Sequence, residues 1–301
     1  MDWLQALLLG LVQGLTEFLP VSSSGHLAIG RALLGVEDSG DLVFEVIVHA
    51  ATVLATIVVF RKEIWKLLCG LFKFKYNDET DYIAKICLSM VPVLVVGVFF
   101  KDAVESAFSS MLVVGLALVV TAMLLTFSDW KAGRVRSKGD AVAPTEGLAA
   151  EAAQGETSPC PLGVQGDSSI GDAVARRNGI SFWQALVVGL GQALAVIPGL
   201  SRSGTTISTG LICGVKRSEM AQFSFLMVLV PILGEAFLDV VGGDLSSSTI
   251  GLLPLLVGFA AAFVSGLFAC KVMIALVRKA QLKWFGLYCA IVGLAVLIFL
   301  V

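Results

Sequence analysis

Hydrophobic residues gather along this chain in long runs that are separated by short polar segments. The runs contain few charged residues, and several approach the roughly 20 residues that an α-helix needs to cross a bilayer. This pattern predicts transmembrane helices and an all-α polytopic membrane protein. The candidate spans lie near residues 43–60, 83–100, 108–127, 219–240, 250–270 and 284–301.

Two further apolar runs, 3–19 and 182–197, differ from the spans because they carry polar residues and then break. Each run is interrupted at a Pro or a Gly and resumes as a shorter apolar segment. Irregular backbone of this kind is tolerated at membrane depth only where it is buried in protein or lines a cavity. We therefore expect two re-entrant helical hairpins, at 3–36 and 182–213. The polar residues in these runs are Gln5, Gln13, Glu17, Gln184 and Gln192.

Composition supports the membrane interpretation. Hydrophobic residues make up 57% of the 301 positions and charged residues only 15%, against about 25% charged in a typical soluble domain. The net charge of −2 provides no basic field for nucleic acid, so we expect no nucleic-acid partner. The six cysteines form no Cys-x-x-Cys pair, which indicates reduced packing residues and not a metal site. The N-terminus has Asp2 where a signal peptide has basic residues, so we expect this segment in the mature protein.

The two halves of the chain align without a gap at an offset of 179 residues. Between residues 5 and 25, ten of 21 positions are identical to their counterparts. They include both glutamines of QALLLGLVQGL, which lies over QALVVGLGQAL, and the Ser-x-Ser-Gly pattern of SSSG, which lies over SRSG. The alignment indicates an internal duplication. We expect a first repeat at 1–130, a flexible linker at 131–179 that is rich in small and polar residues, and a second repeat at 180–301.

Positive charge along the chain predicts how the repeats are oriented. Each repeat has one hairpin and three spans, and an odd number of spans makes the second copy enter the membrane from the opposite face. With the N-terminus outside, 18 of the 21 Lys and Arg residues fall in the cytoplasmic segments, which include the linker. We therefore expect an inverted-topology repeat, in which the ligand site lies where the two broken segments meet.

The second hairpin contains PGLSRSGTT at 198–206, which places Arg202 among hydroxyl residues in an apolar setting. Gly199 allows a tight turn, and we expect the next half-helix to begin near Thr205 or Thr206. A helix N-terminus and a guanidinium both favour phosphate oxygens. The loop therefore predicts a phosphate or diphosphate site, although Arg202 reaching the interface beside helix-capping serines is an alternative. The expected diphosphate ligands in this loop are Ser201, Ser203, Gly204 and Thr206.

The first hairpin contains QGLTEFLPVSSSGH at 13–26, which has a carboxylate, hydroxyls and an imidazole. Gln13 and Glu17 are four residues apart and share one helical face. His26 is suited to proton transfer near neutral pH, and Ser23 could act as a nucleophile with His26 as its base. A structural role for His26 at a helix start is the alternative.

The two hairpins differ at the positions that carry chemistry. The first offers acid–base groups, whereas the second offers an anion clamp. If the hairpins meet, one site combines both functions. The differing pairs are Glu17 with Val196, Ser23 with Arg202, and His26 with Thr205. Elsewhere, Glu45 and His49 share a helical face and could line the site or form a structural hydrogen bond, while Glu235 and Asp239 are weaker candidates.

Both motifs resemble signatures of the undecaprenyl-diphosphate phosphatase family, the bacitracin-resistance proteins of bacterial membranes. The family carries (Glu/Gln)-x-x-x-Glu leading into Pro-Val-Ser-Ser-x-Gly-His, and a Pro-Gly-x-Ser-Arg-Ser-x-x-Thr loop. The segments at 13–26 and 198–206 match both signatures, and the resemblance covers essentially the whole chain. Gln13 takes the permitted alternative to Glu, so no second catalytic carboxylate is present there. The 131–179 linker looks like an insertion outside the family pattern.

The resemblance implies that undecaprenyl diphosphate is hydrolysed to undecaprenyl phosphate and inorganic phosphate, which recycles a lipid carrier of cell-wall synthesis and confers bacitracin resistance. It implies a bacterial inner-membrane protein whose site opens to the extracytoplasmic side, with a polyprenyl diphosphate and membrane lipid as partners. A divalent cation, Mg²⁺ or Ca²⁺, would be held by Glu17 with Gln13. The nucleophile stays open among Ser23, His26 and water. The expected catalytic residues are Glu17, Ser23, His26 and Arg202, with Ser22 and Ser24 as further diphosphate ligands.

Two alternatives remain open at this point. Paired broken hairpins are also transporter architecture, so the chain could flip the polyprenyl phosphate carrier. The presence of Glu17 and His26 in one copy only favours chemistry over symmetric transport. Small residues such as Gly115, Gly258 and Gly266 permit close helix packing, either within one chain or in a homodimer.

Overall fold

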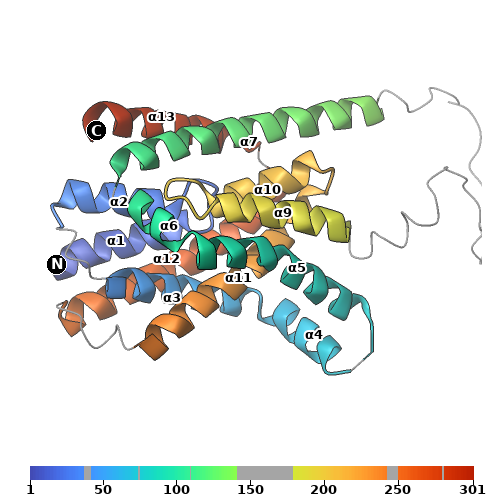
Figure 1. Cartoon of the computed structure of the whole chain (residues 1–301), viewed down its shortest axis with the longest axis horizontal. Coiled ribbons are helices and arrows are strands. Elements are labelled where there is room, and N and C mark those ends of the chain that lie inside the picture. The colour runs from blue at the N-terminus through green and yellow to red at the C-terminus, as the bar shows by residue number, and fades with distance from the viewer. Residues whose placement is uncertain (37–41, 74, 109, 141–178, 243–249, 280) are drawn as a thin grey trace, which may run out of the picture.

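The computed structural model describes residues 1–36, 42–73, 75–108, 110–140, 179–242, 250–279 and 281–301. Within these residues every regular element is a helix, which confirms the all-α prediction (Figure 1). The helices are α1 (Trp3–Thr16), α2 (Ser23–Leu34), α3 (Leu42–Val59), α4 (Arg61–Leu71), α5 (Asp78–Phe99), α6 (Lys101–Phe108), α7 (Met111–Asp140), α9 (Phe182–Leu194), α10 (Arg202–Ile212), α11 (Arg217–Gly242), α12 (Leu252–Lys279) and α13 (Lys283–Phe299).

Three described helices are long and apolar enough to cross a membrane: Asp78–Phe99 in α5, Met111–Gly133 in α7 and Leu252–Met273 in α12. They lie at three of the expected spans. A fourth span is possible if α3 and α4 count together, although the chain bends by 77° between them. The span expected at 43–60 ends with α3, and α4 follows it from Arg61 as a separate helix. Helix α13 has 17 residues and is apolar but shorter.

The two predicted hairpins are present as the pairs α1–α2 and α9–α10, and their ends are built alike. Asp2 and Gln5 form a capping box at the start of α1, as Ser181 and Gln184 do at the start of α9. The same glutamines reach across to the far end of each hairpin. Gln5 Nε2 donates to Leu34 O at 3.2 Å, and Gln184 Nε2 donates to Cys213 O at 2.9 Å. The offset of 179 pairs Gln5 with Gln184 and Leu34 with Cys213, so the two bonds connect equivalent positions of the two hairpins.

The serines at the hairpin tips repeat a second arrangement. Ser22 Oγ accepts from Gly25 N and caps α2, while Ser201 Oγ accepts from Gly204 N and caps α10. The α10 helix therefore begins at Arg202, three residues before the expected start near Thr205, because Ser201 supplies the N-cap. Arg202 occupies the first position of that helix.

Each hairpin packs against a long helix of the other half of the chain. Helix α1 lies against α12, and α9 lies against α5 (Figure 1). Glycines allow both contacts, since a Cβ at Gly10 would lie 2.4 Å from Gly258 O and one at the equivalent Gly189 would lie 2.4 Å from Ser89 O. Close backbone approach through small residues is typical of helix pairs in membranes.

Gly115, Gly258 and Gly266, which could serve close packing within one chain or in a homodimer, contact other helices of the same chain. Added Cβ atoms would meet Leu297 Cδ2 at 2.8 Å from Gly115, Phe44 Cε2 at 2.6 Å from Gly258, and Phe18 Cε2 at 3.3 Å from Gly266. Their small size is therefore explained by intrachain contacts.

The expected linker at 131–179 begins differently from the prediction, because α7 continues as helix to Asp140. Four of its first ten residues are Lys or Arg, which favour helix. Residues 141–178 lie outside the described residues.

Replacement of Gly14 by alanine is expected to destabilise the fold. A Cβ there would lie 2.0 Å from Ser265 Oγ and 2.4 Å from Ala262 O on α12, so the two helices would have to separate. Overpacking of this kind costs about 1–3 kcal/mol in the free energy of unfolding. Thermal unfolding in detergent measures the effect. Gly97→Ala is the control, because a Cβ at Gly97 has no neighbour within 4 Å, and equal melting temperatures for both variants would contradict the packing argument.

Candidate active site

The tips of the two hairpins meet near the middle of the helix bundle. Ser203 Oγ, at the start of α10, donates to Leu19 O in the first tip at 3.2 Å. A Cβ added to Gly25 would lie 3.1 Å from the Cα of Gly199, so the two backbones are in close contact. Gly199 has φ +88° and also abuts Val114 O on α7, a conformation and a contact that favour glycine. The expected meeting of the two motifs is therefore present.

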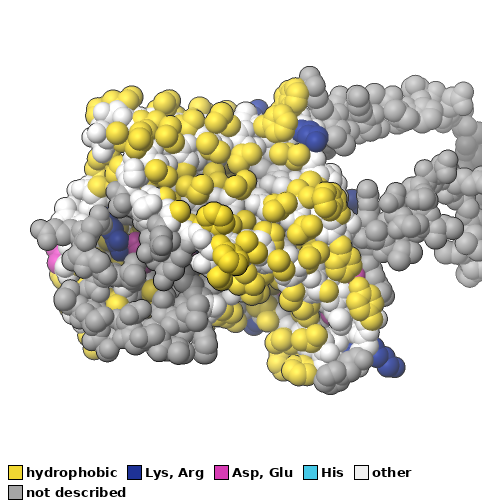
Figure 2. Space-filling view, viewed as in Figure 1, with side chains coloured by type: hydrophobic (Ala, Val, Ile, Leu, Met, Phe, Trp, Pro, Cys, Tyr) yellow, Lys and Arg dark blue, Asp and Glu magenta, His cyan; other side chains and the backbone are white. Residues whose placement is uncertain are grey.

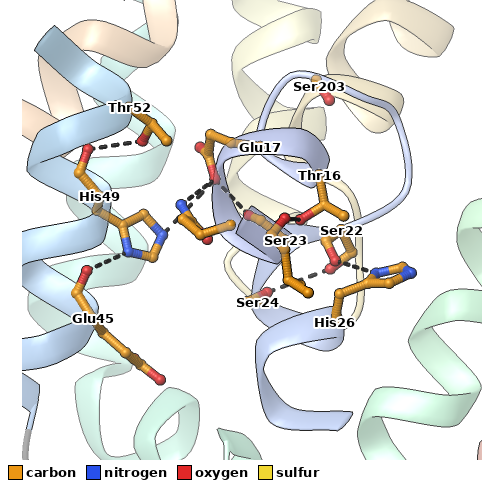
Figure 3. Close-up of polar contacts among 12 residues, drawn as sticks. Thr16, Glu17, Ser22, Ser23, Ser24, His26, Glu45, His49, Thr52 and Ser203 are labelled. Atoms are coloured by element: carbon orange, nitrogen blue, oxygen red, sulfur yellow. Dashed lines mark hydrogen bonds and ion pairs between the residues drawn. The ribbon is translucent and has the colours of Figure 1, made fainter. Parts of the chain in front are cut away.

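Glu17 is the centre of the first tip. Its side chain is 10% exposed and follows directly on the end of α1. The Oε2 atom accepts from Gln13 Nε2 at 3.0 Å and from Ser23 Oγ at 2.5 Å. The α-helical spacing of four residues brings Gln13 to the carboxylate, and the turn at residues 17–22 folds Ser23 back onto it (Figure 3).

The turn that returns Ser23 to Glu17 passes through Ser22, which has φ +70°. It is the one residue other than glycine with a positive φ among the residues that the structure describes. Such a conformation costs of order 1–3 kcal/mol and is found mainly at functional sites. The Ser22 hydroxyl offsets part of this cost by capping α2.

A small polar cavity lies between the two tips. Seven of the expected site residues line it, from both hairpins. A second small cavity adjoins it and is mostly apolar, and the two share Glu17, Arg202 and Ser203. The expected residues in the polar cavity are Glu17, Ser22, Ser23, Ser24, Ser201, Arg202 and Ser203. The apolar cavity is lined by Phe18, Val53, Phe225, Val228, Leu229 and Ile232 together with Thr52 and Thr56.

Arg202 brings the positive charge to this cavity. It is the first residue of α10, where the helix dipole is also positive, and it lines both cavities opposite Glu17. The arrangement combines a planar guanidinium, a helix N-terminus and five serine side chains around one small space. Such a site is suited to the oxygens of a phosphate or diphosphate.

His26 does not contact Ser23, the partner that the sequence suggested for it. Its Nδ1 bonds to Ser22 O at 2.8 Å, and its Nε2 bonds to Tyr288 Oη on α13 at 2.8 Å, with the two rings stacked. The side chain points away from Glu17 and does not line the polar cavity (Figure 3). The expected Ser23–His26 pair is therefore not formed, because Ser23 donates to Glu17 instead.

Two other expected ligands also face elsewhere. Thr206 is fully buried, and its hydroxyl bonds to Ser224 Oγ on α11 at 2.6 Å and to Arg202 O at 2.9 Å. Gly204 lies beneath the Ser201 cap and lines neither cavity. Both residues fix the start of α10, and neither reaches the polar cavity.

The structure brings His49 of α3 into the site. Its Nε2 lies 3.9 Å from Glu17 Oε2, and it lines the polar cavity. From the sequence, His49 could line the site or form a structural hydrogen bond, because helical spacing pairs it with Glu45 and gives no link to the hairpin. The Glu45 carboxylate points away and forms an ion pair with Arg31 at 2.7 Å. The side chains of Glu235 and Asp239 lie outside the described residues.

Known proteins resemble this chain over nearly its whole length. The family model described as bacitracin resistance protein BacA matches residues 6–295. A protein of Parabacteroides distasonis is 49% identical over 298 residues, which cover 98% of this chain and 97% of the relative. A protein of Bacteroides thetaiotaomicron is 47% identical over 302 residues and 99% of both chains, and one of Christiangramia forsetii is 41% identical over 99% and 98%. All three relatives are named undecaprenyl-diphosphatase.

With the family model matching nearly the whole chain and relatives at 41–49% identity, the chain belongs to the bacitracin resistance protein BacA family.

Proposed function

We propose that this protein hydrolyses undecaprenyl diphosphate to undecaprenyl phosphate and inorganic phosphate. The observation that carries the proposal is a polar cavity that Glu17 and Ser23 of one hairpin line together with Arg202 of the other. The names of the relatives support the same reaction. A membrane protein suits this lipid, whose chain stays in the bilayer while its diphosphate enters the protein.

The geometry favours Ser23 as the nucleophile and Glu17 as its base. A hydroxyl that already donates to a carboxylate at 2.5 Å is positioned to lose its proton as it attacks phosphorus. The Ser23 oxygen would form a bond to the terminal phosphorus, the proton would move to Glu17, and undecaprenyl phosphate would leave. His26 and Tyr288 pack behind this tip and would hold the start of α2 in place.

Substrate binding follows from the two adjoining cavities. Arg202 and the serines would hold the diphosphate oxygens in the polar cavity and stabilise charge on the transferred phosphoryl group. The apolar cavity, lined by side chains such as Phe225 and Leu229, would receive the first part of the polyprenyl chain. Because Glu17, Arg202 and Ser203 belong to both cavities, the reacting phosphate would lie at their junction.

A divalent cation fits the donor atoms present. The Glu17 carboxylate and the Gln13 amide are adjacent, and Gln13 Oε1 is buried without a hydrogen-bond partner in the described structure. Oxygen donors of this kind suit Mg²⁺ or Ca²⁺. No cluster of three His, Cys, Asp or Glu side chains occurs among the described residues. The cation would therefore take one carboxylate and one amide oxygen from the chain and the rest of its ligands from substrate and water, and it would neutralise phosphate charge there.

We also infer an inverted-topology repeat in the bacterial inner membrane, with the site open to the extracytoplasmic side. Both chain ends lie at one end of the molecule, whereas α7 extends toward the opposite end (Figure 1). Lys and Arg side chains on the visible face gather mainly toward the end reached by α7, and apolar side chains cover the middle (Figure 2). This distribution supports a cytoplasmic position for the α7 end and for the linker that follows.

Phosphate release from a polyprenyl diphosphate by detergent-purified protein tests the function. We expect release in the presence of Mg²⁺ or Ca²⁺ and its loss on addition of EDTA, with recovery when the cation is restored in excess. Size-exclusion profiles before and after EDTA show whether the fold is unchanged. A well-folded protein that releases no phosphate under any of these conditions would contradict hydrolysis and favour transport of the carrier instead.

A further inference from the structure

This chain has two histidines, His26 and His49. Both form the same kind of hydrogen bond at Nδ1, but their Nε2 atoms face different neighbours. In each, Nδ1 lies 2.8 Å from the backbone carbonyl four residues earlier, Ser22 O for His26 and Glu45 O for His49. A carbonyl oxygen only accepts, so Nδ1 carries the hydrogen and the neutral ring keeps a lone pair on Nε2. His26 uses that lone pair to accept from Tyr288.

The lone pair of His49 is directed into the polar cavity. Its Nε2 lies 3.9 Å from Glu17 Oε2, which is beyond hydrogen-bond distance, so the two groups do not share a proton in this structure (Figure 3). Among the described charged groups, Glu17 and Arg202 line the cavity beside His49. The nearby Glu45 and Arg31 neutralise one another in an ion pair at 2.7 Å.

A phosphatase with a serine nucleophile needs a base twice. The first step transfers the phosphoryl group to the serine, and the second hydrolyses the phosphoserine with water. Glu17 accepts the Ser23 proton in the first step and therefore holds the proton that Ser23 must recover when it leaves. If Glu17 keeps this proton until Ser23 leaves, another group deprotonates the attacking water in the second step, because a protonated carboxyl cannot act as a base.

We propose that His49 is the general base of this second step, an inference that rests on the proposed function with Ser23 as nucleophile. The water oxygen forms a bond to the phosphorus of phosphoserine 23 while its proton moves to His49 Nε2. The phosphorus–Oγ bond breaks, and Ser23 Oγ takes back the proton held by Glu17. Inorganic phosphate leaves, and the His49 proton passes to solvent. The positions of Ser23 and His49 suit these two roles. Ser23 Oγ lies 2.5 Å from Glu17 Oε2, and His49 Nε2 lies 3.9 Å from the same oxygen.

The decisive variant is His49→Gln, which keeps a polar side chain of similar length and cannot act as a base. We expect steady phosphate release to fall about 100-fold, the lower range for loss of an acid–base group. The first turnover should still release one equivalent of undecaprenyl phosphate per protein at close to the wild-type rate. The phosphoryl group should then remain on Ser23, where mass spectrometry of the quenched protein detects it.

Two results overturn this role. One is steady phosphate release by His49→Gln at the wild-type rate. The other is slowing of both steps together without a phosphoprotein, which means that His49 only binds or positions substrate. A second variant, His49→Ala, keeps the test valid if His49→Gln misfolds. Added imidazole should restore phosphate release by His49→Ala. An unchanged rate at all imidazole concentrations contradicts the base role.

The proposed function fails in a distinguishable way. Absence of phosphate release from the wild-type protein contradicts hydrolysis itself. Normal turnover by Ser23→Ala contradicts the nucleophile and, with it, the need for a second base. The double variant Ser23→Ala with His49→Gln should show no phosphoprotein, which assigns the trapped phosphate to Ser23.

Discussion

Replacement of Glu17 by glutamine is expected to lower the turnover number for phosphate release by about 10²–10⁴-fold, the range for loss of an acid–base group. The carboxylate accepts from Ser23 and Gln13 at the junction of the two cavities. Glutamine has the same shape but cannot accept the Ser23 proton and has no negative charge for a cation. The first step should therefore slow, and no phosphoserine should accumulate, in contrast to His49→Gln.

The measurement is single-turnover and steady-state phosphate release in detergent, with thermal unfolding to verify the fold. Glu63→Gln is a matched control, because Glu63 lies on the exposed face of α4 and makes the same change of charge far from the cavity. Cation dependence is recorded for both variants. Glu17→Gln with wild-type turnover and an unchanged response to EDTA would remove Glu17 from the reaction.

Replacement of Arg202 by alanine is expected to lower kcat/KM for a polyprenyl diphosphate by about 10²–10³-fold, the effect of losing one donor to a transition-state oxyanion. Arg202 is the arginine that lines both cavities, and it faces Glu17 from the first turn of α10. Its loss removes charge from the position at which the transferred phosphoryl group would lie.

Arg202→Lys separates charge from geometry. Lysine keeps a positive charge but lacks the planar fork that binds two oxygens at once, so we expect a rate between those of wild type and Arg202→Ala. Arg31→Lys is the matched control, since Arg31 pairs with Glu45 and does not line the polar cavity. If Arg202→Lys and Arg31→Lys both keep the wild-type kcat/KM, the guanidinium does not bind the substrate.

The site could be predicted in part because its motifs are local. The order Gln13, Glu17, Ser23 follows from one helical turn and one tight turn, and the serine caps are short-range bonds of the same kind. The duplicated spacing also predicted which residues would be equivalent, as the bonds from Gln5 to Leu34 O and from Gln184 to Cys213 O illustrate. Local bonds of this type depend on sequence neighbours, which the sequence itself supplies.

The orientation of His26 could not be predicted for the opposite reason. Its partner, Tyr288, lies 262 residues away on α13, and nothing near His26 in the sequence indicates which way its ring turns. The same holds for Thr206, whose hydroxyl is taken by Ser224 of α11. Each side chain has several rotamers open to it, and the neighbouring helix decides among them.

The sequence by itself determined the membrane class of this protein, its two broken hairpins and the motifs that assign it to its family, because hydrophobic period, turn residues and short-range caps are written in consecutive positions. Tertiary structure alone decided that Ser23 bonds to Glu17 and not to His26, and that His49 of α3 enters the cavity. These pairings depend on how closely α1, α3 and α12 approach one another, and glycines such as Gly14 permit that approach only when the partner helix is in place.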